Sequence, residues 1–133
     1  MNTSVFIERI IGKKQLVFLI EDSEGEIFGY YLNTQIFRNI EDKNWMNTDN
    51  KTFHFNLESN GRLDGRKRFN ITNINHGYGL SDKTDEQLLI RIGDIQINKE
   101  NNKQNSCCHK SNDFCEQLHL SFFSFFLITI SRH

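Results

Sequence analysis

Cysteine and histidine residues gather late in the sequence, where they could bind a metal or react with oxidants. The group comprises Cys107, Cys108, His109, Cys115 and His119. Tetrahedral zinc sites commonly use cysteine pairs separated by two to four residues, whereas adjacent cysteines point apart in most backbone conformations. The spacing therefore argues against zinc, and we predict neither a metal nor a cofactor. A redox-active thiol stays open at Cys107, Cys108 or Cys115. His109 and Lys110 are the residues nearby in sequence that could lower a thiol pKa.

A second group of candidate ligands is acidic. Asp22, Glu24 and Glu26 follow an apolar run and could suggest a cation site. An EF-hand loop, however, needs ligands at fixed steps, a glycine at the sixth place and a late bidentate glutamate, and this segment lacks that register. A solvated hairpin turn explains the segment better. We expect Gly25 to adopt a positive φ and the Asp22 side chain to bond the turn backbone.

Glycines, histidines and serines elsewhere give no catalytic pattern. Gly77 and Gly79 resemble half of a phosphate-binding loop, yet no switch from strand to helix follows them. His54 is expected to face outward from a strand, and the serines near turns lack the elbow motif or ordered triad of a nucleophilic enzyme. We therefore predict that the protein is not an enzyme.

The charge balance excludes strongly electrostatic partners. The chain has 133 residues, which suits one domain, and its 16 basic and 17 acidic residues give a net charge of -1. This balance gives no broad attraction to nucleic acid or anionic membranes. Arg62, Arg66, Lys67 and Arg68 form a short basic stretch without the aromatic interleaving typical of a nucleic-acid surface, so we interpret it as a solvated turn and predict no nucleic-acid partner.

Three features bear on location. The N-terminus lacks the basic start and long apolar run of a secretory signal. The three cysteines, an odd number, fit a reducing compartment. The apolar run Leu118–Ile130 is shorter than the about 20 residues that cross a bilayer. We therefore expect a cytoplasmic protein without a transmembrane segment.

The elements that would position these residues begin with a hairpin. Leu16–Ile20 and Ile27–Leu32 are apolar runs of β-forming residues, and the short acidic link between them contains one glycine. This pattern predicts an antiparallel hairpin. Because both runs are almost continuously apolar, we expect strands that are central in a sheet or covered on both faces, with Phe28 in the core.

Alternation predicts two more half-buried strands. In Thr52–Glu58 the apolar side chains share one face, so we predict Phe53, Phe55 and Leu57 inward and His54, Asn56 and Glu58 outward. Lys67–Thr72 gives a second alternating strand, with Phe69 and Ile71 inward.

The remaining segments are shorter or less regular. We expect a short amphipathic helix at Val5–Ile11 and a long loop at Asn33–Lys51, with apolar anchors such as Trp45. We also expect a tight strand or bend at Gly77–Leu80 and a strand pair formed by Gln87–Ile92 and Asp94–Asn98. Gly12 provides the stop signal of the helix, and Gly93 breaks or bulges the strand between its two halves.

The C-terminal stretch changes in character. Leu118–Ile130 carries no Asp, Glu, Lys or Arg and is rich in phenylalanine. It fits a buried closing strand or helix, a segment not native to the domain, or a membrane-surface segment, and the composition leaves all three open. We place the domain at residues 1–115 and a divergent Phe-rich tail at 116–133.

The order of these elements resembles the TLDc (TBC/LysM-associated) domain, especially divergent members from amoebic protists. The resemblance covers about Phe6–Cys108 and is carried by Trp45 and by these motifs in order: L-V-F-L-I-E-D-S-E-G-E-I-F-G-Y-Y-L, T-F-H-F-N-L-E, G-Y-G-L-S-D, L-L-I-R-I-G-D-I-Q-I and Ser106-Cys107. Its fold-motif residues would be Asp22, Gly25, Phe28, Gly29, Gly77, Gly79, Gly93 and Asp94. Family members usually have more helical sequence ahead of the first hairpin, so we expect the domain to be incomplete at its N-terminus.

The resemblance implies a mainly β fold with minor α, an antiparallel two-sheet β-sandwich flanked by short helices. It also implies a non-catalytic role in protection against oxidative stress and, as in several members, binding to the vacuolar proton-pumping ATPase to regulate its assembly. The expected partner is a protein, with subunits of that ATPase as first candidates, and the oligomeric state stays open. Two alternatives stand beside this one: a thiol-based redox sensor or antioxidant, and a degenerate fragment without independent function.

Overall fold

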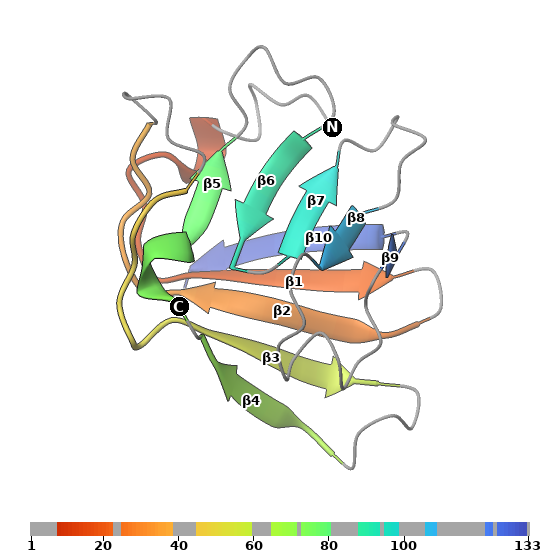
Figure 1. The fold of residues 1–133 in the computed structure, drawn as a ribbon. Coiled ribbons are helices and arrows are strands. Elements are labelled where there is room, and N and C mark those ends of the chain that lie inside the picture. The colour runs from red at the N-terminus through yellow and green to blue at the C-terminus, as the bar shows by residue number, and fades with distance from the viewer. Residues whose placement is uncertain are drawn as a thin grey trace.

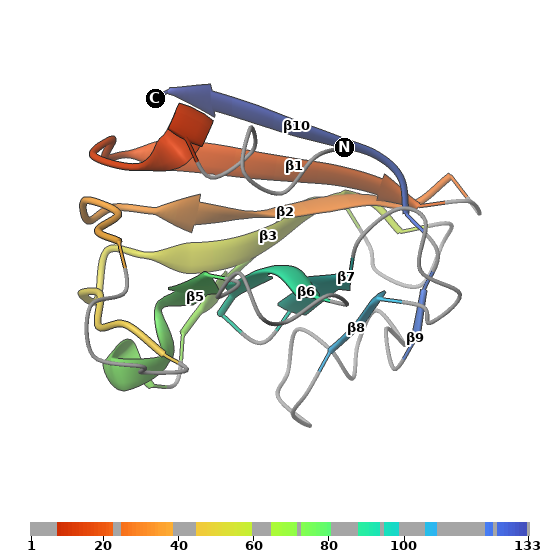
Figure 2. The same ribbon diagram turned by 90° about the horizontal axis from the view of Figure 1, so that it is seen from above.

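Two antiparallel sheets of five strands each pack face to face in this computed structural model (Figures 1 and 2). The structure describes residues 8–22, 25–38, 45–59, 65–71, 73–80, 88–93, 95–98, 106–108, 122–123 and 125–132. Helix is confined, within these ranges, to residues 8–10 and a 3-10 turn at Ile74–His76. The predicted mainly β, two-sheet sandwich with little helix is confirmed.

The first sheet, sheet A, has the strand order β10-β1-β2-β3-β4. Its strands are β1 (Leu16–Asp22), β2 (Ile27–Leu32), β3 (Phe53–Glu58), β4 (Lys67–Asn70) and β10 (Phe125–Arg132). The predicted hairpin is β1 with β2, and both strands lie inside the sheet, as their continuous apolar sequence indicates. The β4 strand forms one border of sheet A.

The second sheet, sheet B, has the order β5-β6-β7-β8-β9. Its strands are β5 (Tyr78–Leu80), β6 (Leu88–Ile92), β7 (Ile95–Asn98), β8 (Ser106–Cys108) and β9 (Phe122–Phe123). They run across the strands of sheet A (Figure 1). Gly93, with a φ of +58°, lies in the tight turn between β6 and β7, where Ile92 pairs with Ile95. The glycine therefore separates two strands, as expected, while Asp94 lies outside the described residues.

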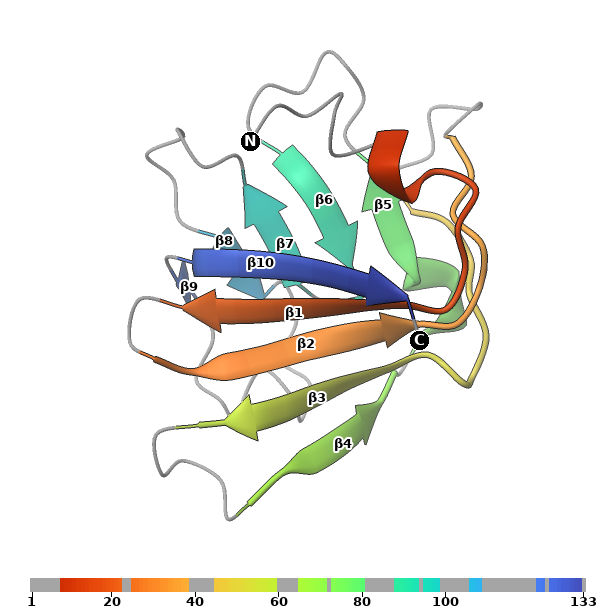
Figure 3. The same ribbon diagram turned by 180° about the vertical axis from the view of Figure 1, so that it is seen from behind.

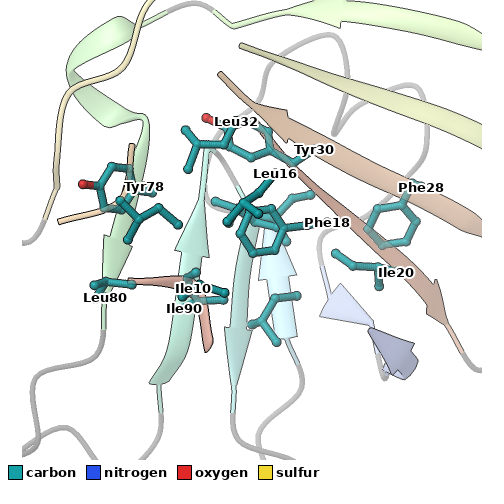
Figure 4. Close-up of a cluster of buried hydrophobic side chains, with 14 residues drawn as sticks. Ile10, Leu16, Phe18, Ile20, Phe28, Tyr30, Leu32, Tyr78, Leu80 and Ile90 are labelled. Carbon is teal, nitrogen blue, oxygen red and sulfur yellow. The ribbon is translucent and has the colours of Figure 1, made fainter. Parts of the chain in front are cut away.

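The core fills the space between the two sheets. Sheet A contributes Leu16, Phe18, Ile20, Phe28, Tyr30 and Leu32, and sheet B contributes Tyr78, Leu80, Ile90, Ile92, Ile95 and Ile97 (Figure 4). Each fully buried side chain of this size stabilises the fold by roughly 1.5–3 kcal/mol relative to exposure. Ile10, from the short N-terminal helix, joins the same cluster. The positive φ of +81° at Gly12 ends this helix, as predicted, and Val5–Ile7 lies outside the described residues.

The predicted facing of β3 is wrong for residues 53–57 and correct for Glu58, which is exposed. His54 and Asn56 are each 1% exposed and point into the sandwich, whereas Phe53 and Phe55 are half-buried on the other side and Leu57 is 36% exposed. The register with β2 explains this inversion, because directly paired residues of antiparallel strands share a face. His54 pairs with the buried Tyr30 and Asn56 with the buried Phe28, which places both inside, whereas Glu58 pairs with Ile27 beyond a register shift and is exposed.

The second alternating strand is shorter than Lys67–Thr72. It ends as β4 at Asn70, and Thr72 lies outside the described residues. Phe69 and Ile71 are half-buried and pack against the core, in agreement with their predicted inward direction.

The loop predicted at Asn33–Lys51 contains no strand in its described part and is held by apolar anchors. Met46 forms an isolated bridge with Tyr78 at the border of β5, and the Trp45 ring stacks on His76 with centroids 4.8 Å apart. The loop therefore closes one side of sheet B.

The C-terminal segment supplies one strand to each sheet. β10 pairs antiparallel with β1 from Leu16 opposite Arg132 to Asp22 opposite Phe125, and β9 pairs with β8. Among the three alternatives for Leu118–Ile130, this pairing favours a closing strand. The structure describes the backbone of this segment and not the burial of its side chains. The division into residues 1–115 and 116–133 stays a prediction.

Candidate interaction surface

The side of sheet A that faces away from sheet B has an apolar centre, and its polar residues include Glu21, Glu58, Arg68 and Asn70. We call this surface the outer face; its described apolar residues are Val17, Leu19, Ile27, Tyr31, Phe53, Phe55 and Leu57. Of the elements that the structure describes, none lies over it (Figure 3). Contiguous apolar surface of this kind marks interaction sites in folded proteins.

Aromatic rings form the centre of the outer face. The Phe53 ring lies 5.3 Å from the Tyr31 ring and 6.2 Å from the Phe55 ring, measured between centroids. The guanidinium carbon of Arg68, on β4, lies 3.9 Å from the Phe53 centroid. An arginine over an exposed ring contributes about 0.5–1 kcal/mol. These contacts hold a platform of fixed rings with a cation at its border.

Gly29 makes this platform possible. A Cβ atom at this position would lie 2.5 Å from Cζ of Phe55 and 2.2 Å from the carbonyl oxygen of Phe18. The absence of a side chain lets the Phe55 ring lie across β2. A glycine inside a strand often marks such a close approach.

Exposed cations line the border of sheet A beside the aromatic rings. Arg66, Lys67 and Arg68 are consecutive and exposed, and the last two belong to β4. These residues are exposed, as predicted for a solvated stretch, and Lys67 and Arg68 belong to the strand predicted at Lys67–Thr72 rather than to a turn. The outer face thus combines an apolar centre with one basic border.

His54 occupies the opposite, buried side of β3 and has no access to a substrate. Its ring centroid lies 4.7 Å from that of Tyr30, and a Cβ on Gly93 would lie 2.4 Å from its Nε2 atom. Burial lowers the pKa of His54 from its usual 6.5 to about 3, and a hydrogen bond with the Gly29 backbone opposes this shift only in part. The neutral imidazole therefore fills the space between the sheets.

The acidic residues of the first hairpin are also structural. Asp22 and Glu26 are buried, so the prediction of a solvated turn is wrong for both side chains. Asp22 Oδ1 accepts a hydrogen bond of 2.8 Å from the backbone N–H of Glu26, and Gly25 has a φ of +85°. The predicted side-chain hydrogen bond of Asp22 and the predicted positive φ of Gly25 are therefore both present. Within the described residues, no three His, Cys, Asp or Glu side chains are grouped as metal ligands would be.

Gly77 and Gly79 lie where the loop and β5 pack tightly. Gly77 has a φ of -74°, and a Cβ there would lie 2.5 Å from Cβ of Thr48. The hydroxyl of Tyr30 donates a 2.6 Å hydrogen bond to the Gly77 carbonyl, which joins sheet A to this segment. Gly79 is buried in β5. Close packing therefore accounts for the glycine at 77.

The candidate thiols are only partly placed. Cys107 and Cys108 lie on β8, where their backbones pair with Gln96 and Ile95 of β7. Their side chains and Cys115 lie outside the description, as do His109 and His119. A redox role for these cysteines stays a prediction.

Alternation alone does not predict the outer face, because it favours burial of the apolar residues of β3. One sequence signal does indicate this face. Gly29 interrupts an apolar strand, and the residue paired with a strand glycine is commonly a large ring that covers it.

Comparison with known proteins agrees with this architecture. The sequence model of the TLDc domain matches residues 1–124. No curated protein matches the chain. No helix in the described residues is long and apolar enough to span a membrane. Because the match covers most of the sequence and the sheets have the expected form, the chain belongs to the TLDc domain family.

Proposed function

We propose that this chain is a non-catalytic protein-interaction domain that binds its partner through the outer face of sheet A. One observation carries the proposal: β3 turns Phe53, Phe55 and Leu57 outward while it buries His54 and Asn56. Half-buried aromatic and aliphatic side chains on a rigid strand provide the apolar anchors that dominate protein interfaces. Membership of a family of protein-interaction domains supports the same conclusion.

The first candidate partner is the vacuolar proton-pumping ATPase. Its support is the family membership, because the resemblance to TLDc domains implies binding to this ATPase as in several members. In this proposal the chain acts in the cytoplasm, and resistance to oxidative stress follows from regulation of the pump. The buried positions of His54, Asp22 and Glu26 support a structural role for the described groups that most resemble catalytic ones.

Two matched variants test the surface. Leu57→Asp places a charge on the outer face, and Ile74→Asp makes the same kind of change at a residue that is 49% exposed in the 3-10 turn before β5 of sheet B. Biolayer interferometry with immobilised, purified ATPase measures the Kd of each variant. We expect Leu57→Asp to weaken binding at least about tenfold and Ile74→Asp to change it less than about twofold.

The reverse result would move the binding surface to sheet B. Equal losses in both variants would argue against any defined surface. Absence of binding by the unmodified chain would remove the ATPase as the partner.

A further inference from the structure

We infer that the outer border of β4, the last strand of sheet A, accepts an extended acidic segment of a protein partner as an added strand. This inference rests on the proposed function, since it specifies how the partner contacts the basic side of the outer face. In sheet A, β4 is the last strand, and its described pairing is with β3 alone. Figures 1 and 3 show β4 at the border of the sheet. A border strand presents backbone N–H and C=O groups that another strand can pair with.

The backbone at the start of β4 is held in place by a buried side chain. Asn56 is 1% exposed; its Oδ1 accepts a 2.9 Å hydrogen bond from Lys67 N, and its Nδ2 donates one of 3.3 Å to the Gly65 carbonyl. The side-chain amide of Asn56 therefore bonds the backbone on either side of Arg66 and holds the start of β4 in place. A fixed strand loses less conformational freedom on pairing than a mobile one, which favours binding.

The charge of the residues at this border favours an acidic partner segment. Arg66, Lys67 and Arg68 are exposed, although the whole chain has a net charge of -1, so positive charge is concentrated at this border. Like charges oppose pairing between the β4 strands of two copies. Carboxylates on an added strand would lie beside these cations, and charge-assisted contacts of this kind give partner selectivity.

The alternation of side chains along β4 specifies the sequence of the bound segment further. Arg68 lies on the outer face over the Phe53 ring, while the neighbouring Phe69 is half-buried and packs against the core on the other face. Residues of an added strand alternate between the same two faces. An acidic residue beside Arg68 and an apolar residue beside Phe69 fit this border. The favoured segment therefore alternates acidic and apolar residues.

The test uses three fluorescein-labelled, end-capped hexapeptides with the full chain. The first alternates Glu and Val, the second alternates Lys and Val, and the third is the Glu–Val peptide with an N-methyl group on every residue. Fluorescence anisotropy should show binding of the first peptide at least about tenfold tighter than of the other two. N-methylation of every residue removes the N–H donors of both peptide edges and leaves the charges unchanged.

Two double variants with equal charge change locate the site. Arg66→Glu with Arg68→Glu should weaken binding of the Glu–Val peptide about tenfold or more. Lys13→Glu with Lys14→Glu, at exposed residues away from β4, should change it less than about twofold. Circular dichroism melting of both proteins shows whether the fold is retained.

Several results would overturn the inference. They are equal binding of the Glu–Val and Lys–Val peptides, equal binding of the N-methylated peptide, equal loss in the two double variants, and no binding at about 1 mM peptide. Self-association of the chain that Arg66→Glu with Arg68→Glu abolishes would assign the border to a second copy instead. If the ATPase still binds when the peptides do not, only strand addition fails; if the peptide binds and the ATPase does not, only that partner fails.

Discussion

Gly93 offers a test of how closely the two sheets fit together. It has a φ of +58°, and a Cβ there would lie 2.4 Å from Nε2 of His54 and 2.7 Å from Cε1 of Tyr30. Alanine in this left-handed conformation costs about 1–2 kcal/mol. Overpacking of a filled interior costs about a further 1–3 kcal/mol. We therefore expect Gly93→Ala to lower the free energy of unfolding by about 2–5 kcal/mol.

Gly25→Ala provides the matched control. Gly25 also has a positive φ, of +85°, but a Cβ there would meet nothing within 4 Å. This variant should therefore lose only the backbone contribution of about 1–2 kcal/mol. Urea unfolding of both variants, followed by fluorescence and circular dichroism, gives the two free energies on one scale.

A double-mutant cycle assigns the additional loss to His54. Truncation by His54→Ala removes the ring that a Cβ on residue 93 would meet, although Tyr30 remains close. Gly93→Ala should then cost at least about 1 kcal/mol less in the His54→Ala protein than in the unmodified chain. A cost for Gly93→Ala no larger than that of Gly25→Ala, or strictly additive losses in the cycle, would refute the proposed contact between the sheets.

Three further predictions concern buried groups. The folded state holds the pKa of His54 at about 3 whereas the unfolded chain has about 6.5, so the unfolded state binds a proton first as the pH falls. The free energy of unfolding should therefore fall as the pH decreases from 6.5 towards 3, by up to about 1.4 kcal/mol per pH unit. Urea unfolding should give a value about 2 kcal/mol lower at pH 5 than at pH 7. Gly29→Ala should destabilise the fold by about 2 kcal/mol or more, measured by the same method, because its Cβ would meet the backbone oxygen of Phe18. Asp22→Ala should cost about 1–3 kcal/mol, since the N–H of Glu26 loses its acceptor.

Each of these predictions has its own control. His54→Gln should reduce the pH 7 to pH 5 difference, and an unchanged difference would show that another group titrates. Phe55→Ala should leave most of the Gly29→Ala loss in place, because the carbonyl of Phe18 remains; full rescue would contradict that explanation. Asp22→Asn keeps an acceptor oxygen and should cost less than Asp22→Ala, so equal losses would contradict the role of the hydrogen bond.

The local pattern of β3 predicts a strand but leaves its direction undetermined. Alternation shows that Phe53 and Phe55 share a face, and nothing within the strand decides whether that face is inside. The decision comes from β2, where Gly29 leaves space for the Phe55 ring on the outside and Tyr30 packs beside His54 on the inside. The sequence of β3 alone favours burial of its phenylalanines, whereas the register of β3 with β2 places them on the outer face.

The first hairpin was predictable because its determinants are local. Its apolar runs, the acidic link and Gly25 lie within one short segment, and the positive φ and the Asp22 bond occur where expected. The contact between Gly93 and His54 and the pairing of β10 with β1 join residues far apart in sequence. Such contacts have no local pattern, so the outer face and the closing strand could be placed only from the structure.

Site-specific photo-cross-linking tests the central claim most directly, namely that a partner covers the outer face. A benzophenone side chain replaces Leu57 in one protein and Ile74 in another, since both residues are large, apolar and exposed. Each protein is irradiated with the purified ATPase and the products are identified by mass spectrometry. A cross-link to an ATPase subunit from position 57, with little or none from position 74, is the predicted result. A cross-link from position 74 alone, or none from position 57, would contradict the account.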